Sequence, residues 1–205
     1  IRMNLNWTAN EQWTVGINSA YSRNRIYSLQ SGNNWMSLLG NATIGSPKNA
    51  TEESPYGEPW IPVENIQQVE TYSTANRWTG GLNVTYAPSQ DFTHRLTLGL
   101  DNVDDQKTRT LPFGYFYVFA NEDGERNIGY RSARNFTFDY LGQLSFGISD
   151  AVRSQLSFGG QGFWETAEVS MATGRQFAGP GVTTVGGAAL TFGDDLTDAE
   201  RAEWN

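Results

Sequence analysis

The stretch Arg77–Asp101, RWTGGLNVTYAPSQDFTHRLTLGLD, decides the fold. Its first half alternates apolar and polar residues from Trp78 to Tyr86, and its second half repeats the alternation from Leu96 to Leu100. A period of two is typical of a β-strand whose two faces meet different surroundings. Residues that favour a turn separate the halves, namely Pro88, Ser89 and Asp91. We therefore expect a β-hairpin with one apolar and one polar face.

The apolar face of this hairpin allows two interpretations. In a soluble β-sandwich it packs against a second sheet, and the polar face meets water. In a membrane barrel it meets lipid, and the polar face lines a wet interior. Trp78 and Tyr86 bound the apolar row, and a strand of about nine residues is long enough to cross a bilayer. An apolar band between aromatic residues is typical of outer-membrane barrels, so the pattern favours the membrane interpretation and leaves the sandwich open.

Composition narrows the function classes. The chain has 205 residues, a net charge of −8 and no cysteine. The acidic balance argues against a nucleic-acid partner, because phosphate binding needs clustered Lys and Arg. The lack of cysteine excludes disulfides and thiolate metal sites. The sequence has no P-loop, no dinucleotide fingerprint and no Gly-x-Ser-x-Gly, so we predict no enzyme, no catalytic residue, no cofactor and no metal.

The same alternation recurs along the chain and predicts about six strands. They lie around Met3–Trp7, Trp13–Tyr21, Trp78–Tyr86, Leu96–Leu100, Phe136–Ile148 and Leu156–Trp164. Short turns alternate with long connections, which we place at residues 28–74, 104–134 and 174–193. Outer-membrane barrels have short periplasmic turns and long extracellular loops. The predicted fold class is therefore all-β, an antiparallel transmembrane β-barrel segment with this asymmetry.

The two ends of the sequence carry further expectations. Thr197 and Glu200 fit a capping box, which predicts a short terminal helix. The first residues already follow a strand pattern and contain no signal peptide. The smallest membrane barrels have about eight strands. We therefore expect residues 1–205 to be part of a longer barrel.

Several stretches, in order, carry a resemblance to a known family: Asn76–Pro88, Leu96–Asp101, Asn135–Tyr140, Ser157–Gln161 and Phe177–Thr184. The chain resembles the barrel region of TonB-dependent outer-membrane transporters, in particular the SusC/RagA-like group. The similarity covers most of the chain, and its specificity lies in order and spacing, because each motif alone is ordinary strand composition. Residues 1–205 would be a middle portion of the barrel domain, with the plug and the remaining strands absent.

The resemblance implies TonB-dependent uptake of a large nutrient, such as an oligosaccharide or a peptide, across the outer membrane of a Gram-negative cell. The implied partners are outer-membrane lipid, the rest of the barrel and its plug, TonB through the plug region, and a SusD-like lipoprotein. Two alternatives stay open. One is a secreted or surface β-sandwich that binds glycans, and the other is a structural or adhesive outer-membrane barrel.

Aromatic residues in the long connections are the candidate ligand or partner contacts: Trp35, Tyr56, Trp60, Tyr115 and Tyr117. Aromatic rings can stack on sugars or anchor a partner. They can equally pack the loops against themselves. The sequence leaves both roles open.

Ionisable residues give weaker signals. His94 is the single histidine and has no ligand cluster around it, so we expect a structural role. Asp101, Asp104 and Asp105 cluster where a strand leaves the membrane, and solvated charge is favoured over a cation site. Asp139 and Glu165 fall on polar faces, where they fit a wet interior better than a glycosidase pair.

Overall fold

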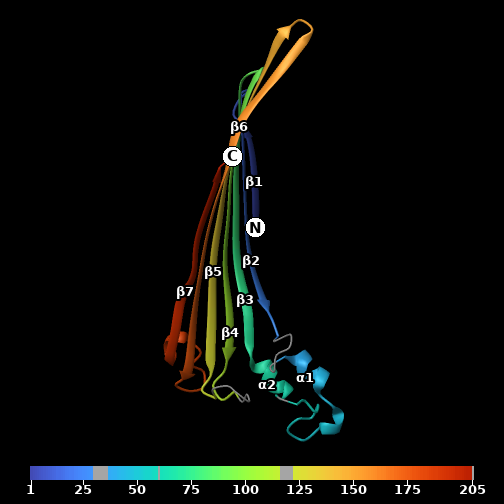
Figure 1. The fold of residues 1–205 in the computed structure, drawn as a ribbon, viewed down its shortest axis with the longest axis vertical. Coiled ribbons are helices and arrows are strands. Elements are labelled where there is room, and N and C mark those ends of the chain that lie inside the picture. The colour runs from blue at the N-terminus through green and yellow to red at the C-terminus, as the bar shows by residue number, and fades with distance from the viewer. Residues whose placement is uncertain (30–36, 60, 116–121, 205) are drawn as a thin grey trace.

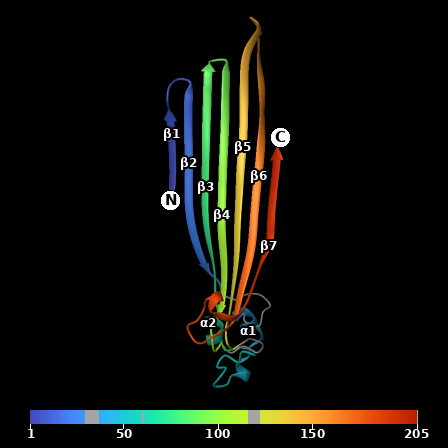
Figure 2. The same cartoon turned by 90° about the vertical axis from the view of Figure 1, so that its left-hand side faces the viewer.

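A computed structural model places the chain in one antiparallel sheet, drawn in Figures 1 and 2. The structure describes residues 1–29, 37–59, 61–115 and 122–204, with the side chains of 195–202 and 204 outside that description. Each strand pairs with the strands next to it in sequence. In order they are β1 (Arg2–Thr8), β2 (Trp13–Tyr27), β3 (Glu70–Ser89), β4 (Phe92–Leu111), β5 (Glu125–Ser149), β6 (Val152–Phe177) and β7 (Ala188–Trp204).

The connections differ between the two ends of the sheet. Short turns at 9–12, 90–91 and 150–151 lie at one end of the sheet, and connections at 28–69, 112–124 and 178–187 lie at the other. Figure 1 shows two short helices at that second end, α1 (Leu38–Ile44) and α2 (Val63–Gln68). This arrangement confirms the predicted fold class. The sheet of the described residues has seven strands where about six were predicted, and the additional strand is β7.

The strands are longer than their alternating patterns. β3 and β4 have 20 residues each, and β5 and β6 have 25 and 26. The predicted connections at 104–134 and 174–193 are therefore partly strand. The β4–β5 ladder continues beyond Asp101↔Asn135 to Leu111↔Glu125. Here both faces carry many polar residues, so the period of two fades from the sequence while the backbone ladder continues.

The predicted terminal helix is also wrong, because residues 197–200 lie in β7. Thr197 pairs with Val169, and Glu200 pairs with Thr166. A capping box satisfies two backbone N–H groups of a short helix. The ladder with β6 satisfies a row of backbone groups along the whole strand, and it outweighs the local signal.

Two short helices occupy the first long connection, and we name residues 37–59 and 61–69 the helical insert. α1 (Leu38–Ile44) begins at Ser37, whose Oγ accepts the Gly40 N–H at 3.1 Å. A 3₁₀ turn (Pro47–Asn49) follows, and α2 (Val63–Gln68) leads into β3. None of the helices in the described ranges is long and apolar enough to cross a membrane.

The insert shares one buried core with the end of β4 and the β4–β5 connection. Its members are Ile61, Ile66, Val69, Leu111 and Tyr115, with Leu38 packed against them. The largest buried side chains of the described residues lie here rather than in the sheet. The sheet itself is one layer, which leaves many large apolar side chains exposed.

A glycine conformation holds the insert together and gives a first prediction. Gly57 has φ +65°, and an added Cβ would collide with the Ser46 carbonyl. That carbonyl neighbours the bond from the Ser46 N–H to the Gly57 oxygen at 3.1 Å. We expect Gly57→Ala to destabilise the insert by at least about 1.5 kcal/mol, which is the cost of placing an alanine in the left-handed conformation. Faster amide hydrogen exchange across residues 45–58 would show it. Gly129→Ala is the control, because nothing lies within 4 Å of its added Cβ, and equal exchange in both variants would contradict the prediction.

Candidate functional site

The register of the sheet gathers apolar side chains on one face, which we name the apolar face. Its central row follows the cross-strand pairs Leu5↔Ile17, Ile17↔Leu82, Leu82↔Leu98 and Leu98↔Phe138. The next row runs from Trp7 through Val15, Val84 and Leu96 to Tyr140. Leu5 is 51% exposed and Ile17 38%. Among the described residues no second sheet covers this face.

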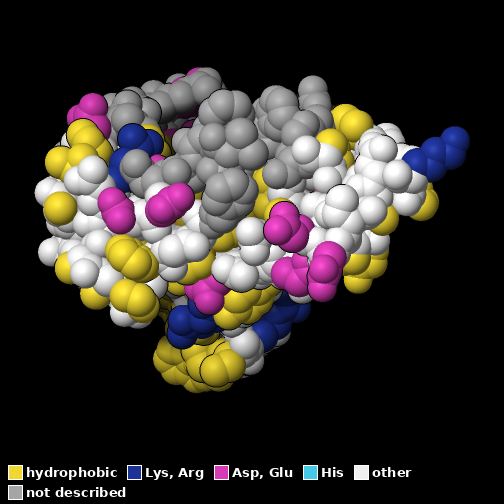
Figure 3. Space-filling model, turned by 90° about the horizontal axis from the view of Figure 1, so that it is seen from below, with side chains coloured by type: hydrophobic (Ala, Val, Ile, Leu, Met, Phe, Trp, Pro, Cys, Tyr) yellow, Lys and Arg dark blue, Asp and Glu magenta, His cyan; other side chains and the backbone are white. Residues whose placement is uncertain are grey.

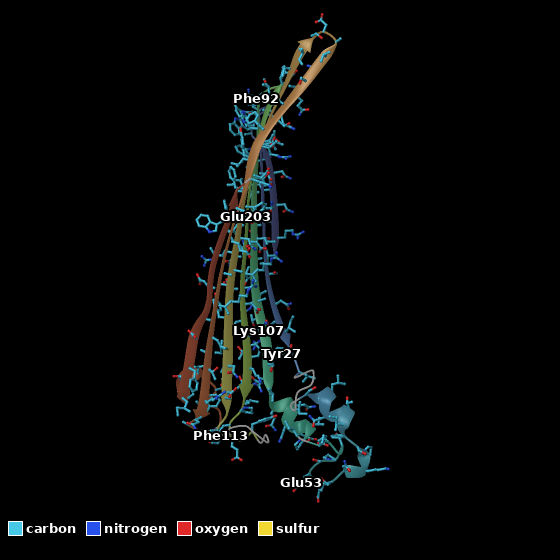
Figure 4. All side chains as sticks on the ribbon, in the orientation of Figure 1. Tyr27, Glu53, Phe92, Lys107, Phe113 and Glu203 are labelled. Carbon is cyan, nitrogen blue, oxygen red and sulfur yellow. The ribbon has the colours of Figure 1, made fainter. Side chains whose placement is uncertain are left out.

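Aromatic rings border the apolar face toward the short turns. Trp13 stacks on Tyr86 with ring centroids 4.1 Å apart, and Phe92 meets His94 edge-on at 4.2 Å. The His94 Nδ1 and the Tyr140 hydroxyl form a hydrogen bond of 2.6 Å. His94 therefore belongs to an aromatic border, in line with the structural role expected for it. Figure 4 labels Phe92 in this border.

A second aromatic border lies toward the long connections. The Trp78 Nε1–H donates to Ser19 Oγ at 2.9 Å, and the Tyr21 hydroxyl donates to Asn76 Oδ1 at 3.1 Å. Eight residue steps separate Trp78 from Tyr86 on β3. At about 3.3 Å per residue this is about 26 Å along the strand. On a strand tilted by about 35–40°, as closed barrels have, this length rises about 20 Å along the barrel axis, which is close to the apolar band of about 25 Å of a membrane barrel.

The band crosses the sheet on a diagonal. The cross-strand row of Trp78 runs through Asn102 on β4 and Arg134 on β5 to Thr166 on β6. The aromatic residue that borders the band on β6 is Trp164, which lies two residues closer to the short turns than Thr166. This border therefore shifts by two residues between β3 and β6, which is three strand steps. At the other border, the cross-strand row of Tyr86 reaches Gly142 on β5. The exposed aromatic residue that borders the band on β5 is Phe146, four residues closer to the short turns than Gly142. This border therefore shifts by four residues over the two strand steps from β3 to β5. Six residues over five strand steps is about one residue per strand. With strands about 4.8 Å apart this slope means a tilt of about 35–40°, as in closed barrels.

The opposite face is polar along the same rows, and we name it the polar face. Arg77 and Asp101 form a bidentate ion pair there, with Nε–Oδ1 at 2.9 Å and Nη2–Oδ2 at 2.5 Å. Thr97 Oγ1 donates to Asn83 Oδ1 at 3.0 Å. The side chains of one face thus bond to each other across strands, as expected for a surface facing water.

Asp139 and Glu165 share the polar face but do not form a catalytic pair. Asp139 pairs with Gln161, so Glu165 lies four residues further along β6. Four residues correspond to about 13 Å along the strands. A glycosidase needs carboxyl groups about 5–9.5 Å apart. The spacing supports the interpretation as polarity of a wet surface.

The expected cluster of Asp101, Asp104 and Asp105 is divided between the two faces. All three lie in β4, where successive side chains alternate. Asp101 pairs with Arg77, and Asp105 accepts a hydrogen bond from Ser73 Oγ at 2.7 Å on the polar face. Asp104 lies on the same side of the sheet as the apolar band, beyond the aromatic border that faces the long connections. The three carboxylates therefore do not converge on one cation.

Asp104 is the centre of a small network beyond the band. Its Oδ1 accepts hydrogen bonds from Ser132 Oγ at 2.8 Å and from the Tyr130 hydroxyl at 3.0 Å, and its Oδ2 accepts from Asn102 Nδ2 at 3.0 Å. The Ser132 bond is the main cause that lowers the pKa of Asp104 below its usual value. The bond to the Asp104 carboxylate in turn raises the pKa of Tyr130.

The helical insert contains an apolar hollow near the long connections. It measures about 370 Å³ and is lined by Leu38, Asn41, Ala42, Gly45, Pro47, Tyr56, Glu58 and Val63. Glu58 is 7% exposed, and its carboxylate accepts the N–H groups of Tyr56 at 3.1 Å and Val63 at 3.3 Å. Glu58 thus fixes the turn that presents Tyr56. Figure 3 views this end of the molecule and shows acidic side chains spread over it.

The structure separates the aromatic residues proposed as contacts. Tyr56 lines the hollow and is 63% exposed. Tyr115 is buried in the core shared with the insert. Trp35, Trp60 and Tyr117 lie outside the described residues. Sequence reasoning missed Glu58 and Val63, since neither repeats with a period, and the only local signal was the turn residues Gly57 and Pro59 around Glu58.

The fold is similar to that of known transporters. The solved structure of the RagAB peptide transporter superposes with a TM-score of 0.71 at 14% identity, covering 99% of this chain and 24% of that chain. The RagAB peptide importer in the open-open state gives 0.69 at 15%, with coverages of 99% and 24%. The closed-closed state gives 0.71 at 13%, with 98% and 24%.

Neither a protein-family model nor a curated protein sequence matches the chain. The chain spans 24% of the length of the solved chains it resembles. At this identity the similarity establishes the fold. The sheet has the fold of a section of these solved chains.

The Asp104 network generates a second prediction. Because the folded-state pKa of Asp104 lies below its unfolded value of about 3.9, its stabilisation is full above about pH 4 and is lost as the pH falls through the folded-state value. Asp104→Asn should therefore lower the melting temperature at pH 7, and the difference from the unaltered protein should shrink in acid. Thermal unfolding of the full-length protein measures this. Asp150→Asn, in an exposed turn, is the control, and an effect of Asp104→Asn that is equal at both pH values would contradict the assigned role.

Proposed function

We propose that residues 1–205 form part of the wall of a TonB-dependent importer of the SusC/RagA-like group in the outer membrane of a Gram-negative cell. The remaining strands and the plug would complete the barrel domain. The cargo would be a large nutrient such as a peptide or an oligosaccharide. The chain would have no catalytic role.

One observation carries the proposal, namely the diagonal apolar band on a single-layered sheet. Many of its large side chains, such as Leu5 and Phe136, are exposed, although exposing apolar area to water costs about 25 cal/mol per Å². Lipid tails would cover the band, and closure with further strands would pair the free edges of β1 and β7. Open sheet edges do not occur in the hydrocarbon region, because each backbone N–H or C=O group without a hydrogen-bond partner there costs several kcal/mol.

The alternatives fit the geometry less well. A glycan-binding sandwich needs a second sheet against the apolar face, and the described part of the chain forms one sheet. An adhesive or structural barrel shares the band. The similarity to structures described as a peptide transporter and importer favours transport over adhesion.

The polar face and the helical insert would carry the transport function. The polar face, with Arg77 and Asp101, would meet the plug and the passing cargo. The insert lies at the end of the long connections, which would be extracellular. A SusD-like lipoprotein would approach from that side, and TonB would act from the periplasmic side through the plug.

The first test of this proposal uses neighbouring residues on opposite faces. In the full-length protein in intact outer membranes, single cysteines at Leu82 and Phe138 should react with a lipid-soluble maleimide and resist a water-soluble one. Cysteines at their neighbours Asn83 and Thr137 should show the opposite preference, because adjacent strand residues point to opposite sides. Strong labelling of Leu82→Cys by the water-soluble reagent would overturn the membrane placement.

The second test concerns cargo capture at the insert. Tyr56→Ala should reduce uptake of a labelled peptide mixture several-fold in cells carrying the full-length protein, because an exposed aromatic anchor is worth about 1–2 kcal/mol. Leu39→Ala, equally exposed but outside the hollow, is the control. Cells lacking TonB define the background. Uptake that persists without TonB would contradict the energised mechanism, and a complete lack of uptake would favour the adhesive barrel.

A further inference from the structure

An arginine on β2 lies over two neighbouring tyrosine rings just outside the apolar band, and the centroids of these rings are 5.6 Å apart. The guanidinium carbon of Arg25 lies 4.1 Å from the ring centroid of Tyr72 and 4.9 Å from that of Tyr27. The face of an aromatic ring attracts a cation, so both rings hold the guanidinium in place from one side. The N–H groups at the rim of the guanidinium stay available for an anion. Figure 4 labels Tyr27 near the end of β2 that leads toward the insert.

The position of Arg25 follows from the register of β2. Trp13, Val15, Ile17 and Tyr21 belong to the apolar face, so Arg23 and Arg25 continue that same side two and four residues beyond Tyr21. These steps correspond to about 7 and 13 Å along the strand, less when the tilt is included. Both side chains are exposed. They therefore lie at the level where the headgroups of the outer leaflet would begin.

Neither Arg23 nor Arg25 is neutralised by a carboxylate in the described part of the chain, so both can bind an anion. Asp104, on the same side two strands away, already accepts hydrogen bonds from three donors. Glu70 also lies on this side, two residues beyond Tyr72. A further cation, Arg126, reaches the Tyr72 hydroxyl with its Nη2 at 3.4 Å and donates from Nη1 to the Thr183 carbonyl at 2.8 Å.

We propose that Arg23 and Arg25 bind the phosphate of a phosphorylated lipid headgroup in the outer leaflet. The inference rests on the membrane placement proposed above. A planar guanidinium binds phosphate through two parallel N–H···O bonds, and aromatic neighbours place it at a membrane interface. Basic groups close to a bilayer surface attract anionic lipid. The protein as a whole carries a charge of −8, so these arginines present a local positive site on an acidic molecule.

Retention of lipid by the purified full-length protein tests the site. The protein is placed in bilayers of zwitterionic phospholipid that contain either phosphorylated lipid A or the same lipid without its phosphates, and bound lipid is counted by native mass spectrometry. The unaltered protein should retain the phosphorylated lipid at least about tenfold better than the double variant Arg23→Ala/Arg25→Ala. Arg25→Lys should give an intermediate value, because it keeps the charge and loses the planar fork. Arg153→Ala, an exposed arginine near the short turns, is the matched control and should retain lipid normally.

The outcomes separate the lipid site from the proposed function. Equal retention by the double variant and the unaltered protein would overturn the site, and so would equal binding of the lipid without phosphates. Displacement of the lipid by millimolar inorganic phosphate would show a site for free anions and would also overturn it. If the cysteine at Leu82 reacts from the lipid phase while retention is unchanged, only the lipid site fails. If that cysteine reacts from water, the membrane placement fails as well. Arg25→Lys tests the site even if the double variant does not fold.

Discussion

The whole structure depends on one constraint, which is that a single sheet separates two different surroundings. Backbone hydrogen bonds within the sheet are satisfied by neighbouring strands, so the side chains alone distinguish its faces. The cross-strand row from Leu5 to Phe138 is apolar, and the row beside it on the opposite face, with Asn83, Thr97 and Asp139, is polar. A shift of one residue in any ladder would exchange these faces. The register is thereby fixed by seven strands together.

The aromatic borders show how side-chain size is matched across strands. Phe158 lies over Gly142, where an added Cβ would collide with its ring, and the ring of Trp78 lies near Gly80. A glycine beside a large ring makes room for it on a crowded face. The diagonal of the band has another origin, namely the registers of the ladders. No single strand contains that slope, since it exists only in the relation between neighbouring registers.

The sequence predicted what repeats and missed what does not. The alternation from Trp78 to Tyr86 and from Phe136 to Ile148 gave the correct faces, because one face of each segment is apolar and the other polar. Beyond the band, Asn102–Thr110 has no such contrast, and the strand there was read as a connection. Thr197 and Glu200 suggested a helix because a local cap is visible in sequence while the partner strand β6 is not. The division of Asp104 from Asp105 follows from strand geometry, but it required knowing that β4 extends that far.

The candidate site was the least predictable part for the same reason. Tyr56 was identified as an aromatic residue in a long connection, yet its orientation depends on the buried Glu58 carboxylate. The diagonal band and the contacts of Arg25 depend on cross-strand pairs that are distant in sequence, such as Asn102 with Arg134 and Tyr27 with Tyr72. Distances of that kind in sequence carry no periodic signal. They appear only when the strands are laid side by side.

The core shared by the helical insert and the β4–β5 connection has a mechanical consequence. Ile61, Ile66 and Val69 come from the first long connection, Leu111 from the end of β4, and Tyr115 from the connection that follows it. Pulling the insert away from the other two would expose all five side chains at about 1.5–3 kcal/mol each. Two segments that are separate along the chain are therefore thermodynamically coupled. A displacement of the insert that keeps this core intact therefore moves the start of β3 and the end of β4 with it.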